Sequence, residues 1–216
     1  MTGFLRTLPA ILLLAACAPG PSPLLQPQPE AYERAAPDSF VVRLETTKGD
    51  VDIIVRRHWS PNAADRFHYL VRHGFYDDIR IFRVVPDFVA QFGLPGDTAV
   101  AAAWRQIKFT DEPVRHSNLR GTLSFARGGE NTRGTQVYIN LRDNARLDTL
   151  NGFGFPPFAE VIVGMESVDS LYSGYGARGV TGPDQGQIAR EGNAYLDREF
   201  PKLDAIRRAQ VLRSWK

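Results

Sequence analysis

The sequence predicts a mainly β fold, a closed eight-stranded antiparallel β-barrel with two or three flanking α-helices. Short runs rich in Val, Ile and Phe recur along the 216 residues, and turn-forming residues separate many of them. Few stretches show helical periodicity. Because an open sheet of this size leaves unpaired edges that invite aggregation, closure into a barrel is favoured.

The composition is that of one globular domain with appendages, with 43% hydrophobic and 23% charged residues. The formal net charge is only +2 and no basic block is visible, which argues against nucleic-acid binding. Only four of the 26 basic residues are lysine, which leaves 22 arginines. An arginine in a candidate site therefore needs support from its context, because most arginines are ordinary surface residues.

Residues 1–16 are predicted to be a lipoprotein signal peptide, because Arg6 precedes an apolar run that stops at Cys17, the only cysteine. The run is shorter than the roughly 20 residues that a membrane-spanning helix needs. The sequence Leu14-Ala15-Ala16-Cys17 resembles a lipobox, in which the cysteine is lipidated. The alternative is an ordinary secretory signal in which Cys17 has no role. A lone cysteine fits lipidation and excludes a disulfide within the chain.

Lipidation predicts a protein of the bacterial cell envelope that is anchored to a membrane and faces the periplasm. The outer membrane is favoured because Ala18 follows the cysteine, where an Asp signals inner-membrane retention in some bacteria. Residues 17–37 are predicted to comprise the lipidated cysteine and a proline-rich linker, since six of the fifteen prolines fall between positions 18 and 37. Such a segment is expected to be an extended, polyproline-like spacer.

The folded domain is predicted to cover residues 38–216 and to begin with a β-hairpin. Two apolar-alternating runs in FVVRLETTKGDVDIIVRR flank a turn at Thr47–Asp50. A helix is expected next, with Ser60 as its N-cap, Pro61 at its first position and Gly74 just beyond its end.

The rest of the domain is predicted to be mostly strands joined by loops. Further strands are expected at 79–85, 88–92, 121–125, 135–141, 157–163 and 204–213, and shorter helices at 165–173 and 186–198. The stretch 95–120 has weak periodicity, which is typical of a functional or covering loop.

Two segments, GFYDDIRIFRVVPDFVAQFG and GTLSFARGGENTRGTQVYINL, resemble the two signature segments of cyclophilin-type peptidyl-prolyl cis–trans isomerases. The similarity extends from about Phe40 to Leu212 and includes the order and spacing of the segments. The resemblance implies rotamase activity (EC 5.2.1.8) that assists protein folding by acting on proline-containing segments of exported proteins. It implies no cofactor and no metal, and we expect a monomer.

The chemistry of X–Pro rotation explains why an arginine would stand in a strand-like stretch. The rotation barrier of about 18–20 kcal/mol comes from amide resonance, whereas the cis and trans forms differ by only about 0.5–1 kcal/mol. A catalyst therefore needs no nucleophile, but it must favour a twisted amide whose prolyl nitrogen regains a lone pair. The Arg83 guanidinium can donate a hydrogen bond to that nitrogen. Strand alternation directs Arg83 away from Phe82 and Val84, which can then lie in the core.

The resemblance implies a role for each residue of the candidate site. Arg83 is the catalytic donor, and Gln91 is the carboxamide that orients Arg83 and bonds the substrate backbone. The expected substrate-binding residues are Phe88, Val89, Tyr138 and Leu147 in an apolar pocket, Ala126 and Arg127 on a strand edge that pairs with the peptide, Gln136 on a polar wall, and Phe155.

Several of these positions depart from the residues usual in the family. Tyr138 stands for Phe, Val89 for Met, Arg127 for Asn and Phe155 for His, and gap-free counting places Arg146 at the usual Trp. Because that Trp is associated with tight cyclosporin binding, we expect weak cyclosporin sensitivity. The lost contacts also bear on catalytic efficiency, although the arginine itself is retained.

Two other functions fit the same residues. In the first, the same candidate site binds proline-containing segments of an envelope partner with little catalysis. In the second, the protein is an envelope scaffold that works through residues 18–37. A metal enzyme is not indicated, because His68 and His73 lie five residues apart in the expected helix and do not share a face.

Overall fold

The computed structural model describes residues 22–176 and 181–216, so Cys17 and the predicted signal peptide lie outside the described residues. The strands are β1 (Ser39–Thr46), β2 (Gly49–Arg56), β3 (Ile79–Arg80), β4 (Arg83–Val85), β5 (Val89–Phe92), β6 (Thr122–Phe125), β7 (Val137–Asn140), β8 (Pro157–Val163) and β9 (Ala205–Trp215). The helices are α1 (Pro29–Tyr32), α2 (Pro61–Arg72), α3 (Thr98–Trp104), α4 (Met165–Asp169), α5 (Gln185–Glu191) and α6 (Asn193–Glu199), with short 3₁₀ helices at Ala145–Asp148 and Leu150–Gly152.

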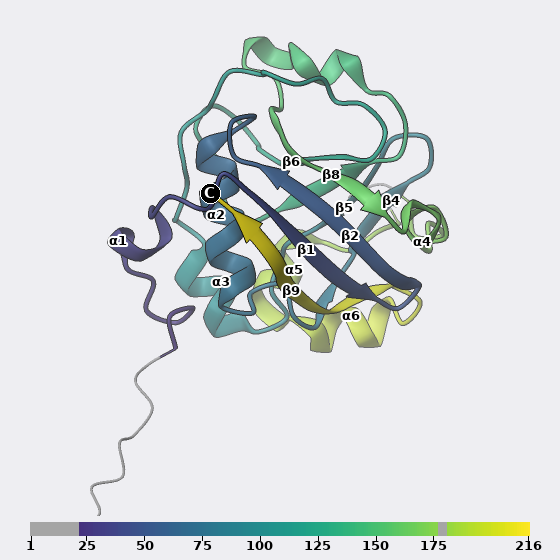
Figure 1. The fold of residues 1–216 in the computed structure, drawn as a ribbon. Helices are drawn as coiled ribbons and strands as arrows, with labels where there is room; N and C mark the ends of the chain where they lie inside the picture. The colour runs from purple at the N-terminus through teal and green to yellow at the C-terminus, as the bar shows by residue number, and fades with distance from the viewer. Residues whose placement is uncertain (1–21, 177–180) are drawn as a thin grey trace, which may run out of the picture.

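The described strands form one curled antiparallel sheet in the order β3-β9-β1-β2-β8-β6-β7-β5-β4 (Figure 1). The mainly β prediction is confirmed, but nine strands replace the expected eight because the predicted strand 79–85 is divided. Its first half, β3, pairs with β9, and its second half, β4, pairs with β5. The two ends of the sheet are therefore joined through the chain at residues 81 and 82 and not by a ladder of hydrogen bonds between β3 and β4.

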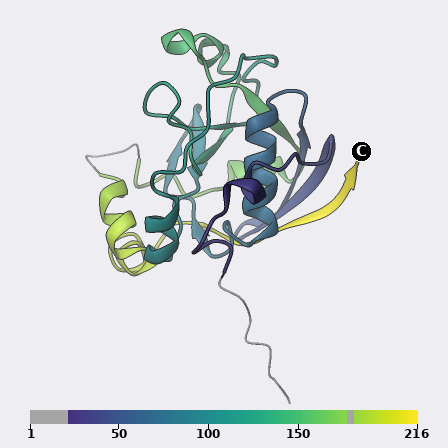
Figure 2. The ribbon, with the colours of Figure 1, turned by 90° about the vertical axis from the view of Figure 1, so that its left-hand side faces the viewer.

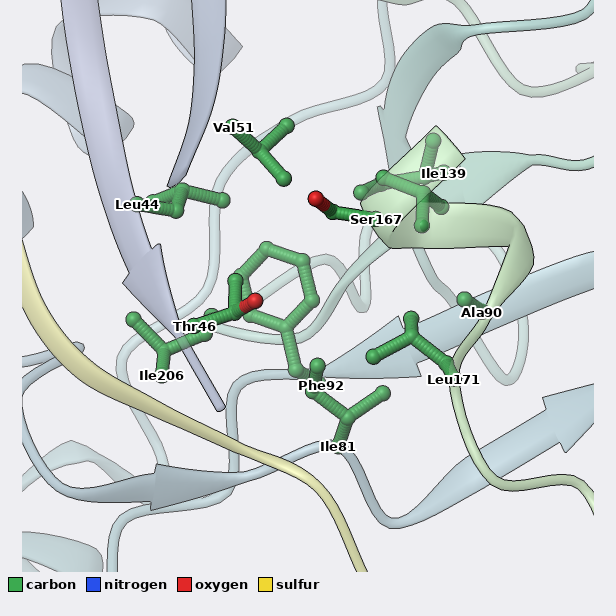
Figure 3. A pocket seen from close by; sticks show the side chains of 11 residues that line it. Leu44, Thr46, Val51, Ile81, Ala90, Phe92, Ile139, Ser167, Leu171 and Ile206 are labelled. Carbon is green, nitrogen blue, oxygen red and sulfur yellow. The ribbon is translucent and has the colours of Figure 1, made fainter. Parts of the chain in front are cut away.

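The predicted hairpin is confirmed, since β1 and β2 pair in register from Ser39–Arg56 to Thr46–Gly49. The other predicted strands are also present, with ends that differ by no more than two residues from those expected. Apolar side chains fill the interior of the curled sheet, and Figure 3 shows Leu44, Phe92 and Ile206 converging there around a small apolar cavity. The hydroxyl-bearing side chains of Thr46 and Ser167 also line this cavity.

Helix α2 packs its buried face, which includes Phe67 and Leu70, against the sheet. It ends as predicted before Gly74, whose φ is +72°. Ser60 is the N-cap residue and Pro61 the first helical residue, as predicted, but the Ser60 hydroxyl donates to the Glu112 carboxylate and does not bond the helix backbone. Glu112 itself accepts from the backbone N–H groups of residues 62 and 63, at 2.9 and 3.2 Å, and so caps the helix from a distant loop.

The prediction of an extended spacer is wrong for the described part of the linker. Residues 22–37 pack against α2 and α3, where α1 lies along α2 (Figure 2). Trp104 Nε1 donates to the Leu24 carbonyl at 3.0 Å, and the Tyr32 ring lies 4.9 Å from the Arg66 guanidinium carbon. The four prolines of residues 22–37 did not prevent this packing, because Leu24, Tyr32 and Ala36 supply apolar surface between them.

The predicted helix 186–198 is two helices, α5 and α6, because Gly192 adopts φ +61° between them. A side chain at Gly192 would collide with the Gly96 carbonyl, which explains the glycine. The predicted helix 165–173 is the shorter α4, and the loop expected at 95–120 contains α3. None of the helices in the described ranges has the length and apolar character needed to cross a bilayer.

Candidate active site

A small apolar cluster, separate from the main core, contains the residues predicted to form the proline pocket, and we call this cluster the pocket. Its buried members are Val89 from the start of β5, Tyr138 from β7 and Leu147 from a 3₁₀ helix. The side chains of Phe88, Ala126 and Phe155 pack against them. The structure thus brings together six of the ten residues predicted for the site, although they span almost seventy positions of the chain.

The register of the sheet places the polar candidates beside this pocket. Arg83 is paired with Gln91, Gln91 with Tyr138, and Tyr138 with Ser124, across four neighbouring strands. Because directly paired residues point to the same face of a sheet, all four side chains share the face of the pocket. Arg83 Nη1 donates to Gln91 Oε1 at 3.0 Å, and Gln91 Nε2 donates to the predicted wall residue Gln136 at 2.8 Å.

The Phe88 ring borders two guanidinium groups. The guanidinium carbon of Arg83 lies 5.6 Å from the ring centroid and that of Arg146 lies 5.2 Å from it, both within the range of a cation–π contact. Arg146, at the position expected for Trp, is therefore at the border of the site. An open hollow lined by Phe88, Arg142 and Arg146 continues from there.

Arg127 supports the loop on the other side of the pocket. Its guanidinium carbon is 4.9 Å from the Phe155 ring centroid, and its nitrogens donate to the carbonyls of Leu150 and Gly154 at 3.0 and 3.2 Å. The neighbouring Ala126 N–H already donates to the Gln136 carbonyl at 2.9 Å. In the structure the Arg127 side chain therefore binds this loop, while the expected peptide pairing would involve main-chain groups.

A group of polar side chains beside the pocket is buried except for the half-buried Asp148, and we call it the asparagine network: Asn118, Ser124, Tyr138, Asn140 and Asp148. Asn118 Oδ1 accepts from the Tyr138 hydroxyl at 3.0 Å, from Ser124 at 3.2 Å and from Asn140 at 3.2 Å. Its Nδ2 donates to Asp148 and to the Phe155 carbonyl, both at 2.8 Å. Burial raises the pKa of Tyr138, so its hydroxyl stays protonated.

The asparagine network explains how Tyr138 replaces the usual phenylalanine, because Asn118 accepts a hydrogen bond from the buried tyrosine hydroxyl. Asn118 was missed from the sequence. It lies in the weakly periodic stretch 95–120, and its position beside the pocket depends on contacts with residues 20 or more positions away. Only the polar character of Ser117-Asn118 before a strand would have drawn attention to it.

The assembled site combines the apolar cluster with guanidinium groups at its border, those of Arg83, Arg127 and Arg146. Within residues 22–176 and 181–216, no group of three His, Cys, Asp or Glu side chains is placed to hold a metal ion. The Arg83 guanidinium presents N–H donors at the edge of this apolar cluster, beside Phe88.

Comparison with known proteins agrees with this chemistry. The family described as "Cyclophilin type peptidyl-prolyl cis-trans isomerase/CLD" matches residues 41–189. Peptidyl-prolyl cis-trans isomerase A of Dickeya dadantii is 34% identical over 145 residues, which cover 63% of this chain and 73% of that protein. Peptidyl-prolyl cis-trans isomerase CYP18-2 of Arabidopsis thaliana is 34% identical over 138 residues, covering 61% of this chain and 80% of the relative.

Solved structures show the same fold. A cyclophilin-type peptidyl-prolyl cis-trans isomerase of Cryptosporidium parvum has a TM-score of 0.59 and 20% identity, covering 82% of this chain and 99% of that one. Cyclophilin AquaCyp293 of Hirschia baltica has a TM-score of 0.56 and 17% identity, and the match covers 86% of this chain and 78% of that one. The chain therefore belongs to the cyclophilin-type peptidyl-prolyl cis–trans isomerase family.

Proposed function

We propose that this isomerase uses Arg83 as its catalytic residue and Gln91 to orient it. In the twisted amide, the prolyl nitrogen regains a localised lone pair that a guanidinium can bind, whereas the planar ground state offers no such acceptor. The bond therefore lowers the barrier without tightening binding of the planar peptide. One observation carries this assignment: the sheet register places Arg83 and Gln91 in one row with Tyr138 of the pocket.

The proposed ligand is a proline-containing peptide segment whose ring enters the pocket of Val89, Tyr138 and Leu147. The Cryptosporidium parvum isomerase was also solved in the presence of the dipeptide Ala-Pro, with 19% identity to this chain. That relative supports the same class of ligand here. We propose Phe88, Ala126 and Phe155 as further walls, with Arg127 and Gln136 at the border.

Exchange NMR on an Ala-Pro peptide tests the assignment. Arg83→Ala should lower the catalysed exchange rate by about 10²–10³-fold, the size of one lost transition-state donor, while peptide affinity falls less. Arg83→Lys keeps the charge but loses the planar guanidinium with its several donors, so its exchange rate should lie between those of the wild type and Arg83→Ala. A wild-type protein that binds the peptide without accelerating exchange would favour the rival function, a weak proline-peptide-binding module.

The proposed setting is the bacterial cell envelope, with Cys17 lipidated, the domain facing the periplasm, the outer membrane favoured, and exported proteins as substrates. The lipobox-like sequence before the lone cysteine supports this proposal. Labelling with a palmitate analogue should mark the wild-type protein but not Cys17→Ser, which should also leave the membrane fraction. Equal labelling, or equal membrane association, would contradict the anchor and favour an ordinary secretory signal.

A further inference from the structure

Helices α5 and α6 contact Phe82, the residue just before the strand that carries Arg83, although they lie more than 100 residues further along the chain. Phe82, the residue before Arg83, is excluded from the main core and packs in a separate cluster with Ile188, Tyr195 and Leu196. In Figures 1 and 2 these helices gather with α3 at one end of the curled sheet. The two helices thus hold one neighbour of the catalytic arginine directly.

A second contact reaches Arg83 through side-chain amides. Gln136, which accepts from Gln91, itself donates from Nε2 to Gln185 Oε1 at 3.3 Å. Together with the Arg83–Gln91 bond this forms a chain of three hydrogen bonds, which we call the amide relay: Arg83, Gln91, Gln136 and Gln185. The relay crosses a shielded region, since Gln91 is only 7% exposed.

The relay has a fixed direction. A guanidinium can only donate hydrogen bonds, so Gln91 must turn its oxygen toward Arg83 and its nitrogen toward Gln136. The same logic turns the nitrogen of Gln136 toward Gln185, which must supply an acceptor. An acceptor at position 185 therefore selects the amide orientations that Arg83 requires.

Position 185 is itself well anchored. Gln185 is the first residue of α5, and the preceding Asp184 caps that helix by accepting from the Gln187 N–H at 2.8 Å. The Asp184 N–H donates to the Tyr195 hydroxyl at 3.1 Å, and Tyr195 belongs to the cluster around Phe82. The contact to Phe82 and the contact to the relay thus arise from one packed unit.

We propose that Gln185 is a positioning residue for the isomerase reaction, and that it acts through Gln136 and Gln91 on the orientation of Arg83. This inference rests on the proposed role of Arg83. Gln185 is not a member of the apolar cluster and bonds the site through Gln136, so its proposed contribution to the rate runs through the arginine and not through binding of the proline ring.

Substitutions at position 185 test the inference by exchange NMR with an Ala-Pro peptide. Gln185→Met removes the strong acceptor at similar length and should lower the exchange rate at saturating peptide by about two- to tenfold, with peptide affinity changed by less than about twofold. Gln185→Glu keeps an acceptor oxygen and should retain the wild-type rate within about twofold. Gln187→Met is the matched control on the same helix and should leave the rate unchanged.

Two further measurements separate positioning from a general structural effect. Because the relay passes through Gln91, Gln185→Met should add no further loss in a Gln91→Met background. The Arg83 Nε–Hε NMR resonance, identified by its absence in Arg83→Ala, should shift in Gln185→Met and not in Gln187→Met.

A wild-type rate in both Gln185→Met and Gln185→Ala would overturn the inference, and so would a loss that persists at full size in the Gln91→Met background. A normal rate in Arg83→Ala would instead overturn the proposed function. The two failures are therefore distinguishable.

Discussion

The amide relay and the asparagine network both approach the pocket along the row that contains Gln91 and Tyr138, but they end in different environments. The relay ends at the half-buried guanidinium of Arg83 on the border of the pocket. The asparagine network ends at Asn118, which is fully buried and has five hydrogen bonds to side chains or carbonyls. The difference suggests separate roles: the amide relay is placed to orient the Arg83 donor, whereas the asparagine network is placed to stabilise the shape of the pocket.

This difference has an energetic basis. Deleting a buried hydrogen-bonding partner leaves other buried groups unpaired, which costs folding free energy. In the relay, Gln91 is buried but its partners Arg83 and Gln136 are only half-buried, so water can reach the groups that its loss frees, and the loss is expected mainly in the reaction rate. Substitutions in the asparagine network should therefore change stability, and substitutions in the amide relay should change catalysis.

The largest effect is expected from Asn118→Ala. It removes the partner of the Tyr138 hydroxyl and of Asp148, so the free energy of unfolding should fall by about 2–4 kcal/mol. Denaturant unfolding measures this loss. Asn62→Ala, at an exposed asparagine on α2, is the control and should stay within about 0.5 kcal/mol of wild type. Equal stability of the two variants would remove the structural role assigned to the network.

The second effect is expected from Gln91→Met in the relay. Loss of the amide that orients Arg83 should lower the exchange rate by about tenfold, equivalent to about 1.4 kcal/mol of barrier. The free energy of unfolding should change by less than about 1 kcal/mol, in contrast to Asn118→Ala. The comparison breaks down if the stability loss of Gln91→Met equals that of Asn118→Ala while its rate is normal.

A smaller effect is expected from Arg146→Trp beside Phe88. Restoring the aromatic residue usual in the family should raise cyclosporin affinity by about two- to tenfold, since an aromatic contact contributes about 0.5–1.5 kcal/mol. The exchange rate should change by less than twofold, because Arg146 belongs to neither the relay nor the network. Calorimetric titration measures the affinity, with Arg142→Trp in the same hollow as the control.

The smallest effect is expected from Tyr138→Phe, and it should depend on pH. Asn118 keeps its other donors, so the variant should lose only about 0.5–1 kcal/mol of unfolding free energy near pH 8. Burial raises the pKa of Tyr138 in the folded state, so above the unfolded value of about 10 the unfolded chain releases this proton more readily.

The stability that the hydroxyl contributes is therefore present below about pH 10 and is lost as the pH rises further. Urea unfolding of both proteins at pH 8 and pH 11 should show the wild-type advantage shrinking at the higher pH. Tyr76, also buried, titrates in both proteins and cancels in the difference. An advantage that grows with pH would contradict the sign of this linkage.

The elements that depend on local pattern were predictable from the sequence. The hairpin at β1 and β2 follows from alternation around a tight turn, and α2 follows from helical spacing between Pro61 and Gly74. The candidate pocket and the arginine could be named because two contiguous segments carry the family resemblance. Their roles in this chain stay predictions until the exchange measurements are made.

Contacts between distant residues decided the rest. The cap on α2 comes from Glu112, some 50 residues beyond the helix start, and the linker packs because α2 and α3 present aromatic surface to it. Likewise, Gln185 bonds Gln136 only because α5 packs against Phe82. Sequence periodicity records which face of an element is apolar, but the partner of each polar side chain is set by how the elements pack in space.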